Sequence, residues 1–494
     1  MALTSTLGCD PPRRLKRSGS RPRPGRVQAA HSSGSSGRYV WSFRSRPDLH
    51  PPTIDVVTRA HDTAPGYIFV APKTGPREHS ASQDGWMIVD NGGEPVWFKP
   101  LQSEEEALPE GDFKVQRYRG EEVLTFWKGL EGGKGPAEYG ILDSSYQEIS
   151  RVRAGNGYEG DDHEFLITPQ GSALFTIYTT VNSFDLSSVG GSKEGGVVAG
   201  IVQEVDIETG DVLFEWHSLD HVPPDESYAS PSKNPRKRFD YFHINSIEVD
   251  HDSNLLVSAR NTFTVYKIDR SSGELIWRLG GKKSNFEMGA GTRTRYQHDA
   301  RRNSDGTISI FDNGGVYKDD KSYGLMLDLD MDEMTASLVR RYAQPQGRVS
   351  ATKGNMQMLP NGNVFIGWGS TPLFSEFSSD GELLFNASFP PGVEFYRAFR
   401  FPWSGQPSDD PAMVAERGSD DKVTLYASWN GATEVATWEV LAGPEPEQLK
   451  PVGSVPRHGF ETAITVGTAE RYVGVQAKDS SGRVLGASKA TRAI

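Results

Sequence analysis

Between Asp240 and Gly315 the chain repeats one pattern twice. Phe242-His-Ile-Asn-Ser246 and Gln297-His-Asp-Ala300 each place a histidine at the start of a strand-like run. The runs that follow end in Ser258-Ala-Arg260 and in Phe311-Asp-Asn-Gly314. The β-branched and apolar residues between these points favour short strands. The pattern therefore predicts strand pairs that bring two histidines and an arginine together.

A second recurring unit extends this pattern over most of the chain. It consists of an aspartate, a short Gly- or Ser-containing turn and an apolar or aromatic strand. Its copies begin at Asp90, Asp143, Asp206, Asp269, Asp330 and Asp380. Six copies, each with several short strands, are typical of a β-propeller. We therefore predict an all-β protein with a six-bladed β-propeller.

Each blade is expected to begin with a hairpin whose tight turn contains glycine or asparagine. Eight residues before the turn glycine lie Asp112, His163, His298 and Gly354, the last beside Asn355. His243 has the same place in a blade with a slightly longer turn. Because the innermost strands of a propeller line its central channel, these positions are expected to meet in one funnel. The ends of the second strands are expected at the same mouth and carry Trp127, Tyr178, Arg260, Asn313 and Trp368.

Composition divides the chain into four parts. Residues 1–40 are rich in Arg, Ser, Pro and Gly and are predicted to be a basic tail, either disordered or wrongly assigned to the chain. A transit peptide is the alternative, since the tail has no apolar segment typical of a secretory signal peptide. Residues 41–404 are the predicted propeller, and 405–418 a linker. Residues 419–494 alternate with period two and predict a small immunoglobulin- or fibronectin-like β-sandwich.

Charge and motif content exclude several functions. The net charge of −12 argues against general nucleic-acid binding. The chain contains no run of 18 apolar residues, so no transmembrane helix is predicted. Neither a zinc-type Cys/His spacing nor a phosphate-binding loop is present, and Cys9 is the single cysteine. We therefore predict no cofactor, and the sequence does not determine the oligomeric state.

The chemistry is expected at His163, His243, His298 and Arg260. The simplest interpretation is that each histidine only satisfies a hydrogen bond inside the channel. Three histidines also match a catalytic zinc set, but a neighbouring arginine would repel a cation, so no metal is predicted. An arginine favours an oxyanion such as sulfate, phosphate or carboxylate. A neutral imidazole beside it could attack that group and carry it as a covalent intermediate.

Other polar and aromatic residues complete the predicted site. Asp161, Asp162 and Asp299 either orient the imidazoles or cap turns and strand ends. The residues predicted to bind substrate are Asn245, Asn313, Trp127, Tyr178, Trp368 and Asn355.

The motifs also resemble a known family. Trp277-Arg-Leu-Gly-Gly281, Gly367-Trp-Gly369 and Ser428-Trp-Asn-Gly431, together with the histidine and arginine motifs above, are similar to the arylsulfotransferase family, in particular its filamentous-fungal branch. The similarity covers roughly residues 41–490.

This resemblance implies a propeller that moves sulfate from an aryl sulfate ester to a phenolic acceptor through a sulfohistidine, without the nucleotide donor PAPS. By motif, His298 is similar to the nucleophile. His243 and Arg260 are similar to the sulfate-binding groups, and His163 to the fourth funnel residue. The family implies a small phenolic or aromatic substrate and secretion. The sequon Asn386-Ala-Ser388 is a predicted glycosylation site.

Two alternatives remain open from the sequence. The first is a propeller-fold cyclase or pericyclase of hetero-Diels–Alder type in fungal secondary metabolism, which would use Trp127, Tyr178, Trp368 and Arg260. The second is a non-catalytic propeller that binds a ligand. The sequence identifies neither donor nor acceptor.

Overall fold

A computed structural model describes residues 39–75, 82–101, 111–129, 136–315, 320–418 and 422–493. The predicted basic tail lies outside these residues up to position 38. Nearly all regular secondary structure of the described chain is β, which confirms the predicted all-β class. Its helices are the four-residue α1 (Ser218–His221) and the 3-10 turns η1 (Ser187–Val189) and η2 (Pro224–Glu226). Within the described chain, no helix is long and apolar enough to span a membrane.

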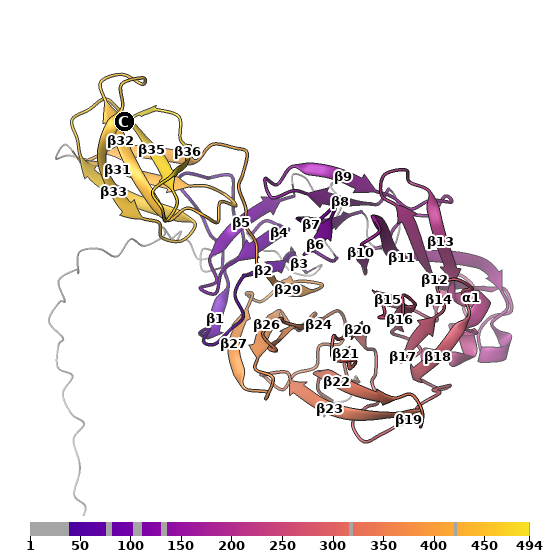
Figure 1. The fold of residues 1–494 in the computed structure, drawn as a ribbon. Coiled ribbons are helices and arrows are strands. Elements are labelled where there is room, and N and C mark those ends of the chain that lie inside the picture. Colours follow the sequence, from indigo (N-terminus) through magenta and orange to yellow (C-terminus); the bar gives the residue numbers. More distant parts are fainter. Residues whose placement is uncertain are drawn as a thin grey trace, which may run out of the picture.

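Within the described residues, six sheets form a ring (Figure 1). Each has four main strands, paired antiparallel to their neighbours. The first sheet contains β29 (Ala398–Phe401), β2 (Tyr67–Val70), β4 (Gly85–Val89) and β5 (Pro95–Pro100). The second contains β6 (Lys114–Tyr118), β7 (Glu121–Lys128), β8 (Glu138–Leu142) and β9 (Glu148–Val152).

The third and fourth sheets carry most of the long loops. The third contains β10 (Phe165–Ile167), β11 (Ser172–Phe184), β12 (Gly195–Asp206) and β13 (Val212–His217), and β14 (Phe239–Asp240) pairs parallel with β12. The fourth contains β15 (Ile244–Val249), β16 (Leu255–Ala259), β17 (Thr264–Ile268) and β18 (Leu275–Gly280).

The fifth and sixth sheets each gain one additional strand. The fifth contains β20 (His298–Arg302), β21 (Ile308–Asp312), β22 (Tyr323–Asp330) and β23 (Thr335–Ala343), with β19 (Glu287–Met288) at its edge. The sixth contains β24 (Asn355–Met358), β25 (Val364–Gly367), β26 (Leu373–Phe377) and β27 (Leu383–Ser388), with β1 (Asp55–Thr58) at its edge. A further pair joins β3 (Lys73–Thr74) to β28 (Val393–Glu394).

The ring is closed by strands from distant parts of the chain. The inner strand of the first sheet, β29, follows all the other sheets in sequence, whereas its partner β2 precedes them. In the opposite direction, β1 from the start of the described chain pairs with β27 of the sixth sheet. Inner strands contact their neighbours around the ring, β29 with β6 and β24, and β20 with β15 and β24. The six sheets are therefore held as one unit.

The repeat in the sequence accounts for this topology. Each of the six aspartate turns lies between the third and fourth strand of a sheet. In the fourth sheet, Asp269 Oδ1 accepts hydrogen bonds from the backbone N–H groups of Ser271 and Ser272 at 2.9 Å, which holds the turn. The hairpin glycines Gly171 and Gly306 have φ of +86° and +90°, a conformation that glycine adopts without strain.

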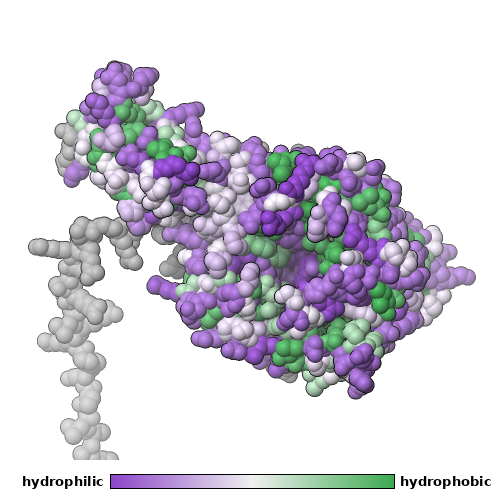
Figure 2. All heavy atoms as spheres, in the orientation of Figure 1, coloured by the Kyte–Doolittle hydropathy of each residue, from purple (hydrophilic) through white to green (hydrophobic). Residues whose placement is uncertain are grey.

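Apolar side chains pack between neighbouring sheets. Leu256 and Val265 of the fourth sheet, for example, share one buried cluster with Ile308 and Leu325 of the fifth. Hydrophilic residues cover most of the face seen in Figure 2, and hydrophobic residues lie there in small separate groups. The apolar faces of the sheets are thus buried against neighbouring sheets, and polar residues lie at the strand ends and in the loops.

Two further sheets follow the ring. One contains β30 (Ala412–Arg417), β31 (Lys422–Ser428) and β34 (Glu461–Gly467). The other contains β33 (Lys450–Pro456), β32 (Thr437–Gly443), β35 (Tyr472–Lys478), β36 (Val484–Ala487) and β37 (Thr491–Arg492). They share a buried core that includes Leu425, Trp438 and Val475.

The linker predicted over 405–418 is wrong in its second half, because β30 pairs with β31 along its whole length. This C-terminal unit also contacts the ring. The side-chain amide of Asn430 donates to the carbonyl of Phe98 and accepts from its N–H, each at 2.9 Å. The hydroxyl of Tyr146 donates to the Gly431 carbonyl at 2.8 Å.

Candidate functional site

The predicted histidines meet in a cavity of about 550 Å³. His163 and His243 lie just before the inner strands β10 and β15, and His298 is the first residue of β20. Arg260 follows β16 directly, and Tyr178 comes from β11. All five side chains line the cavity. The sequence pattern therefore predicted which of these side chains meet in one cavity.

His298 has its protonation fixed by its partners. Its Nδ1 lies 2.6 Å from Asn313 Oδ1 and 3.0 Å from the Tyr296 carbonyl oxygen. Asn313 donates its amide N–H groups to the carbonyls of Ser350 and Lys353, at 2.7 and 2.9 Å, so its oxygen must face the imidazole. His298 Nδ1 is therefore the protonated donor. Nε2 is therefore unprotonated, and its lone pair is available to a ligand in the cavity.

The surroundings keep His298 neutral. Burial, followed by the positive surroundings of His243 and Arg260, lowers the pKa of His298 well below its ordinary value. A neutral imidazole with a free Nε2 is the form that acts as nucleophile or base.

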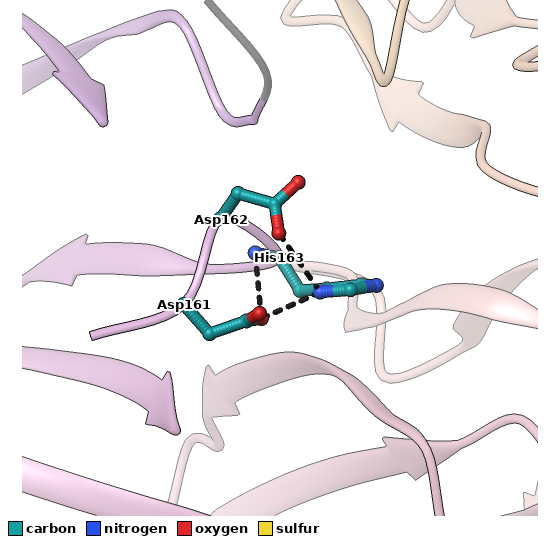
Figure 3. Close-up of side chains that lie close together, drawn as sticks. All are labelled: Asp161, Asp162 and His163. Carbon is teal, nitrogen blue, oxygen red and sulfur yellow. Dashed lines mark hydrogen bonds and ion pairs between the residues drawn. The ribbon is translucent and has the colours of Figure 1, made fainter. Parts of the chain in front are cut away.

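His163 has the opposite charge state. Its Nδ1 lies 2.5 Å from Asp161 Oδ1 and 3.4 Å from Asp162 Oδ1 (Figure 3). Burial alone would lower the pKa of His163, but the charges of Asp161 and Asp162 outweigh burial and raise it to about 10. His163 is thus an imidazolium near neutral pH. The ring points its other nitrogen, Nε2, away from both carboxylates (Figure 3).

Asp161, Asp162 and His163 also form a group whose possible metal-ligand atoms lie within 4.8 Å of one another. The hydrogen bond between His163 Nδ1 and Asp161 uses the imidazole nitrogen that would coordinate an ion here. Asp161 Oδ1 accepts further hydrogen bonds from the His163 N–H and from Thr176 Oγ1. An ion-paired imidazolium accounts for this geometry, so we assign the group no metal.

His243 is held by a carboxylate that the sequence analysis did not assign. Its Nδ1 lies 2.5 Å from Asp240 Oδ2. Asp240 belongs to β14, whose parallel pairing with β12 sets it beside the cavity. His243 itself has φ of +57°, a left-handed conformation that is rare outside glycine. Its ring centroid is 5.3 Å from that of His163, so the two imidazoles face the same space.

Arg260 supplies the positive charge for an oxyanion. Its guanidinium lies 4.5 Å from the ring centroid of Tyr296 and donates to Asn261 Oδ1 and to the Ala351 carbonyl. Its Nε–H is buried and has no hydrogen-bond partner among the described residues. Burial lowers the pKa of Arg260, yet a guanidinium remains charged in proteins. Arg260 lines the cavity, where its guanidinium can bind an anion.

Four of the predicted substrate-binding residues do not line the cavity. Trp127 and Trp368 are buried, and their indole N–H groups donate to the Gly160 carbonyl and to Ser375 Oγ. The Asn355 amide exchanges hydrogen bonds with the backbone of Ala398. Asn245 donates to the Gln297 carbonyl. Trp127, Asn245 and Asn355 link neighbouring sheets through these bonds. The Trp368 bond stays within the sixth sheet, and its ring packs against Phe311 of the fifth. None of the four therefore lies at the predicted funnel mouth.

Asn313 lies behind the cavity as well, where it holds His298 rather than facing a ligand. Asp299 does not orient an imidazole. Its carboxylate pairs with Arg301 at 2.6 Å and accepts the N–H of Met356.

The structure also contradicts the predicted glycosylation site. Asn386 lies in β27, is 3 % exposed and accepts a hydrogen bond from Ser375 Oγ at 2.9 Å. Its neighbour across the strand pair is Thr58 of β1. The folded chain has no room for a glycan at this side chain.

The sequence analysis missed Tyr396, which lines the cavity between His163 and His298. Its ring centroid is 5.2 Å from His163 and 6.5 Å from His298. Tyr396 precedes the inner strand β29 as His163 precedes β10, and Tyr396-Arg-Ala398 parallels His298-Asp-Ala300. That parallel is the signal that could have revealed it.

An ion cluster lies next to the cavity-lining residues. It joins Asp112, Lys114, Glu164, Glu248, Asp299, Arg301 and Arg397. Several of its members directly follow a cavity residue in the inner strands, as Glu164 follows His163 and Arg397 follows Tyr396. The ion pairs of this cluster fix the starts of these inner strands relative to one another.

The fold and the site together define an all-β, propeller-like protein whose central cavity combines a neutral histidine with an arginine. The sequence profile of the arylsulfotransferase (ASST) family matches residues 114–390, more than half of the chain. The protein belongs to this family. No match was found among curated proteins.

Solved structures show only weak similarity. A protein of unknown function from Bacteroides caccae has 14 % identity and a TM-score of 0.40, over 68 % of this chain and 100 % of that one. Virginiamycin B lyase from Staphylococcus aureus has 9 % identity and a TM-score of 0.34, over 76 % and 97 %. The GH43 protein BlXynB from Bacillus licheniformis has 10 % identity and a TM-score of 0.32, over 77 % and 89 %. These scores carry no argument about function.

Proposed function

We propose that the protein is a PAPS-independent aryl sulfotransferase that moves sulfate from an aryl sulfate ester to a phenolic acceptor through a sulfohistidine at His298. The observation that carries the proposal is the neutral His298, whose Nε2 is left free by the hydrogen bond from Nδ1 to Asn313. Membership of the arylsulfotransferase family supports the same class of reaction. We also propose that the six sheets are blades of one propeller and that the C-terminal sheets form a sandwich.

In the first step, His298 Nε2 attacks the sulfur of the donor. The N–S bond forms as the bond from sulfur to the aryl oxygen breaks. The leaving oxygen takes a proton from His163, whose pKa of about 10 is close to that of a phenol. Arg260 and His243 stabilise the charge on the transferring sulfuryl oxygens.

In the second step, the acceptor phenol attacks the same sulfur. Its proton returns to His163, the N–S bond breaks, and the electron pair stays on His298 Nε2. Both residues regain their starting states, so one cavity serves donor and acceptor in turn.

The cyclase alternative has less support. It relied on Trp127, Tyr178 and Trp368 as aromatic surfaces for a bound intermediate. Tyr178 lines the cavity, but Trp127 and Trp368 are buried outside it.

The test is to mix the purified protein with excess 4-nitrophenyl sulfate, without acceptor, and to follow nitrophenol release and intact mass. We expect a burst of about one nitrophenol per protein and a mass gain of one SO3 group. In His298→Ala, the adduct should disappear and release should fall by about 10³-fold or more. The exposed His251, replaced by alanine, is the control and should behave as wild type. Sulfate transfer at a normal rate by His298→Ala would contradict the proposal.

A further inference from the structure

A second cavity, also of about 550 Å³, lies beside the fourth and fifth sheets. It is lined by Phe263 from the β16–β17 turn, by Arg295 from the segment before β20, and by Gly314 from the segment after β21. The first of these segments also carries Arg260, the second leads directly into His298, and the third carries Asn313, which holds His298. This side cavity therefore shares its supporting segments with the central cavity.

One wall of the side cavity is aromatic. The rings of Tyr228 and Phe263 stack with their centroids 4.2 Å apart and an interplanar angle of 9°. Tyr323 lines the cavity as well. The ammonium group of Lys282 lies 5.1 Å from the Tyr228 ring centroid. Such surfaces bind flat aromatic groups, and nearby cations favour those that carry negative charge.

The cations of the side cavity outnumber its carboxylates, although the chain as a whole carries a net charge of −12. Arg293 and Lys321 make no side-chain hydrogen bond or ion pair with the described residues. Arg295 is 3.9 Å from Asp320. Asp312 Oδ1 already accepts the backbone N–H groups of Arg295 and Gly314, at 2.8 and 3.1 Å. Within the described part of the chain, Arg293 and Lys321 thus have no carboxylate partner.

We propose that the side cavity binds a planar aromatic anion, such as an aromatic carboxylate or sulfonate. Arg293, one of these two cations, would bind the anionic group through its guanidinium N–H donors, and Arg295 also lines the cavity. The ring would lie against Tyr228 and Phe263. The volume suits a ligand of one or two rings. The inference is independent of sulfate transfer, because the side cavity and the central cavity have no lining residue in common.

The ligand would lie close to the reacting groups. Phe263 and Tyr296 meet edge to face with ring centroids 4.7 Å apart, and Tyr296 lies under the Arg260 guanidinium. The aromatic anion can therefore be an extension of a larger substrate or a separate molecule. Competition between the aromatic anion and 4-nitrophenyl sulfate distinguishes an extension of the substrate from a separate molecule. Either result is consistent with binding in the side cavity.

The test uses 1-naphthoate, a fluorescent aromatic carboxylate with no hydroxyl to accept sulfate, and its neutral analogue 1-naphthamide. Both are titrated against the full-length protein by fluorescence. We expect naphthoate to bind at least about tenfold more tightly than the amide. Arg293→Gln should remove about tenfold of that affinity, whereas Arg293→Lys, which keeps the charge, should lose less. Phe263→Leu should weaken both probes.

Arg236→Gln is the matched control, since Arg236 is exposed and does not line the side cavity. Circular dichroism establishes that each variant is folded. Equal affinities for the acid and the amide, or no binding of naphthoate at millimolar concentration, would overturn the proposal. Unchanged affinity in folded Arg293→Gln and Phe263→Leu would overturn it too. So would loss of binding in Arg260→Gln alone, because the probe would then occupy the central cavity.

Discussion

At the scale of single residues, the partner of each imidazole decides what the histidine can do. His163 and His298 occupy equivalent positions at the start of inner strands. Two carboxylates raise the pKa of His163 to about 10, whereas burial, followed by the positive surroundings of His243 and Arg260, lowers the pKa of His298 and leaves the ring neutral. One repeat position thus carries a charged imidazole in one sheet and a neutral imidazole in another, the two states that the proposed mechanism needs for its proton donor and its nucleophile.

Replacing the amide beside His298 with a carboxylate should reverse its state. In Asn313→Asp, the new negative charge would raise the pKa of His298 by about 1–3 units. A raised pKa means that the neutral form is lost as the pH falls through the new value. The rate of the nitrophenol burst should therefore show an acid limb at a higher pH than in wild type.

The measurement is the pH dependence of that burst between pH 5 and 9, checked by NMR titration of His298. Asn313→Ala adds no charge and is the control: it should lower the rate without moving the acid limb to higher pH. An Asn313→Asp profile that parallels wild type on the acid side would show that the amide does not set the charge of His298.

At the scale of elements, the site depends on the backbone at the starts of the inner strands. His243 and Asp299 have φ near +55°, and Gly354, just before β24, has φ of +100°. A Cβ at Gly354 would come within 2.4 Å of the Phe311 ring. This glycine therefore serves both conformation and close packing.

Gly354→Ala should cost clearly more stability than an alanine at an open turn. Gly120, with φ of +87° and no atom within 4 Å of its ideal Cβ, is the matched control. Gly120→Ala should lose about 1–2 kcal/mol from the left-handed backbone alone. Gly354→Ala should lose about 1–3 kcal/mol more through overpacking against Phe311. Urea unfolding measures both values, and equal losses would contradict the packing argument.

The same elements explain what the sequence could predict. Counting back eight residues from a turn glycine found His163 and His298, because each inner strand there has its own tight hairpin. The inner strand of the first sheet, β29, is the last of the six inner strands along the chain. It pairs with β2, which precedes the other ring sheets in sequence, and it has no such hairpin. Counting therefore could not find Tyr396.

Side-chain direction limited the prediction in a different way. The register of β15 with β16, and of β20 with β21, shifts just inside the cavity. Such irregularities change which side chain faces the channel. Trp127 and Trp368 end second strands as Arg260 and Asn313 do, yet they point into the packing between sheets. Residue type and spacing alone do not show this difference.

At the scale of the whole molecule, one arginine connects most of the ring. Arg397, at the start of β29 in the first sheet, is fully buried. Its guanidinium reaches carboxylates before or in the second, third and fifth sheets, at Asp112, Glu164 and Asp299. It also donates to the Asn245 carbonyl of the fourth sheet at 2.8 Å. The contacts needed to close the ring are thus concentrated at its centre.

Arg397→Met should therefore destabilise the whole ring. Without the guanidinium, the cluster keeps four carboxylates but only Lys114 and Arg301 as cations, and breaking a buried ion pair costs about 3–5 kcal/mol. Urea unfolding should show that loss in a single transition, since the affected contacts span five of the six sheets. Arg153→Met is the control, because its ion pair with Glu138 is exposed on the arginine side, at 65 %, and should contribute less than about 1 kcal/mol. A loss of stability in Arg397→Met no larger than in Arg153→Met would contradict this prediction. The ring would then be held by the packing between its sheets and by strand pairing at its closure, not by the charges at its centre.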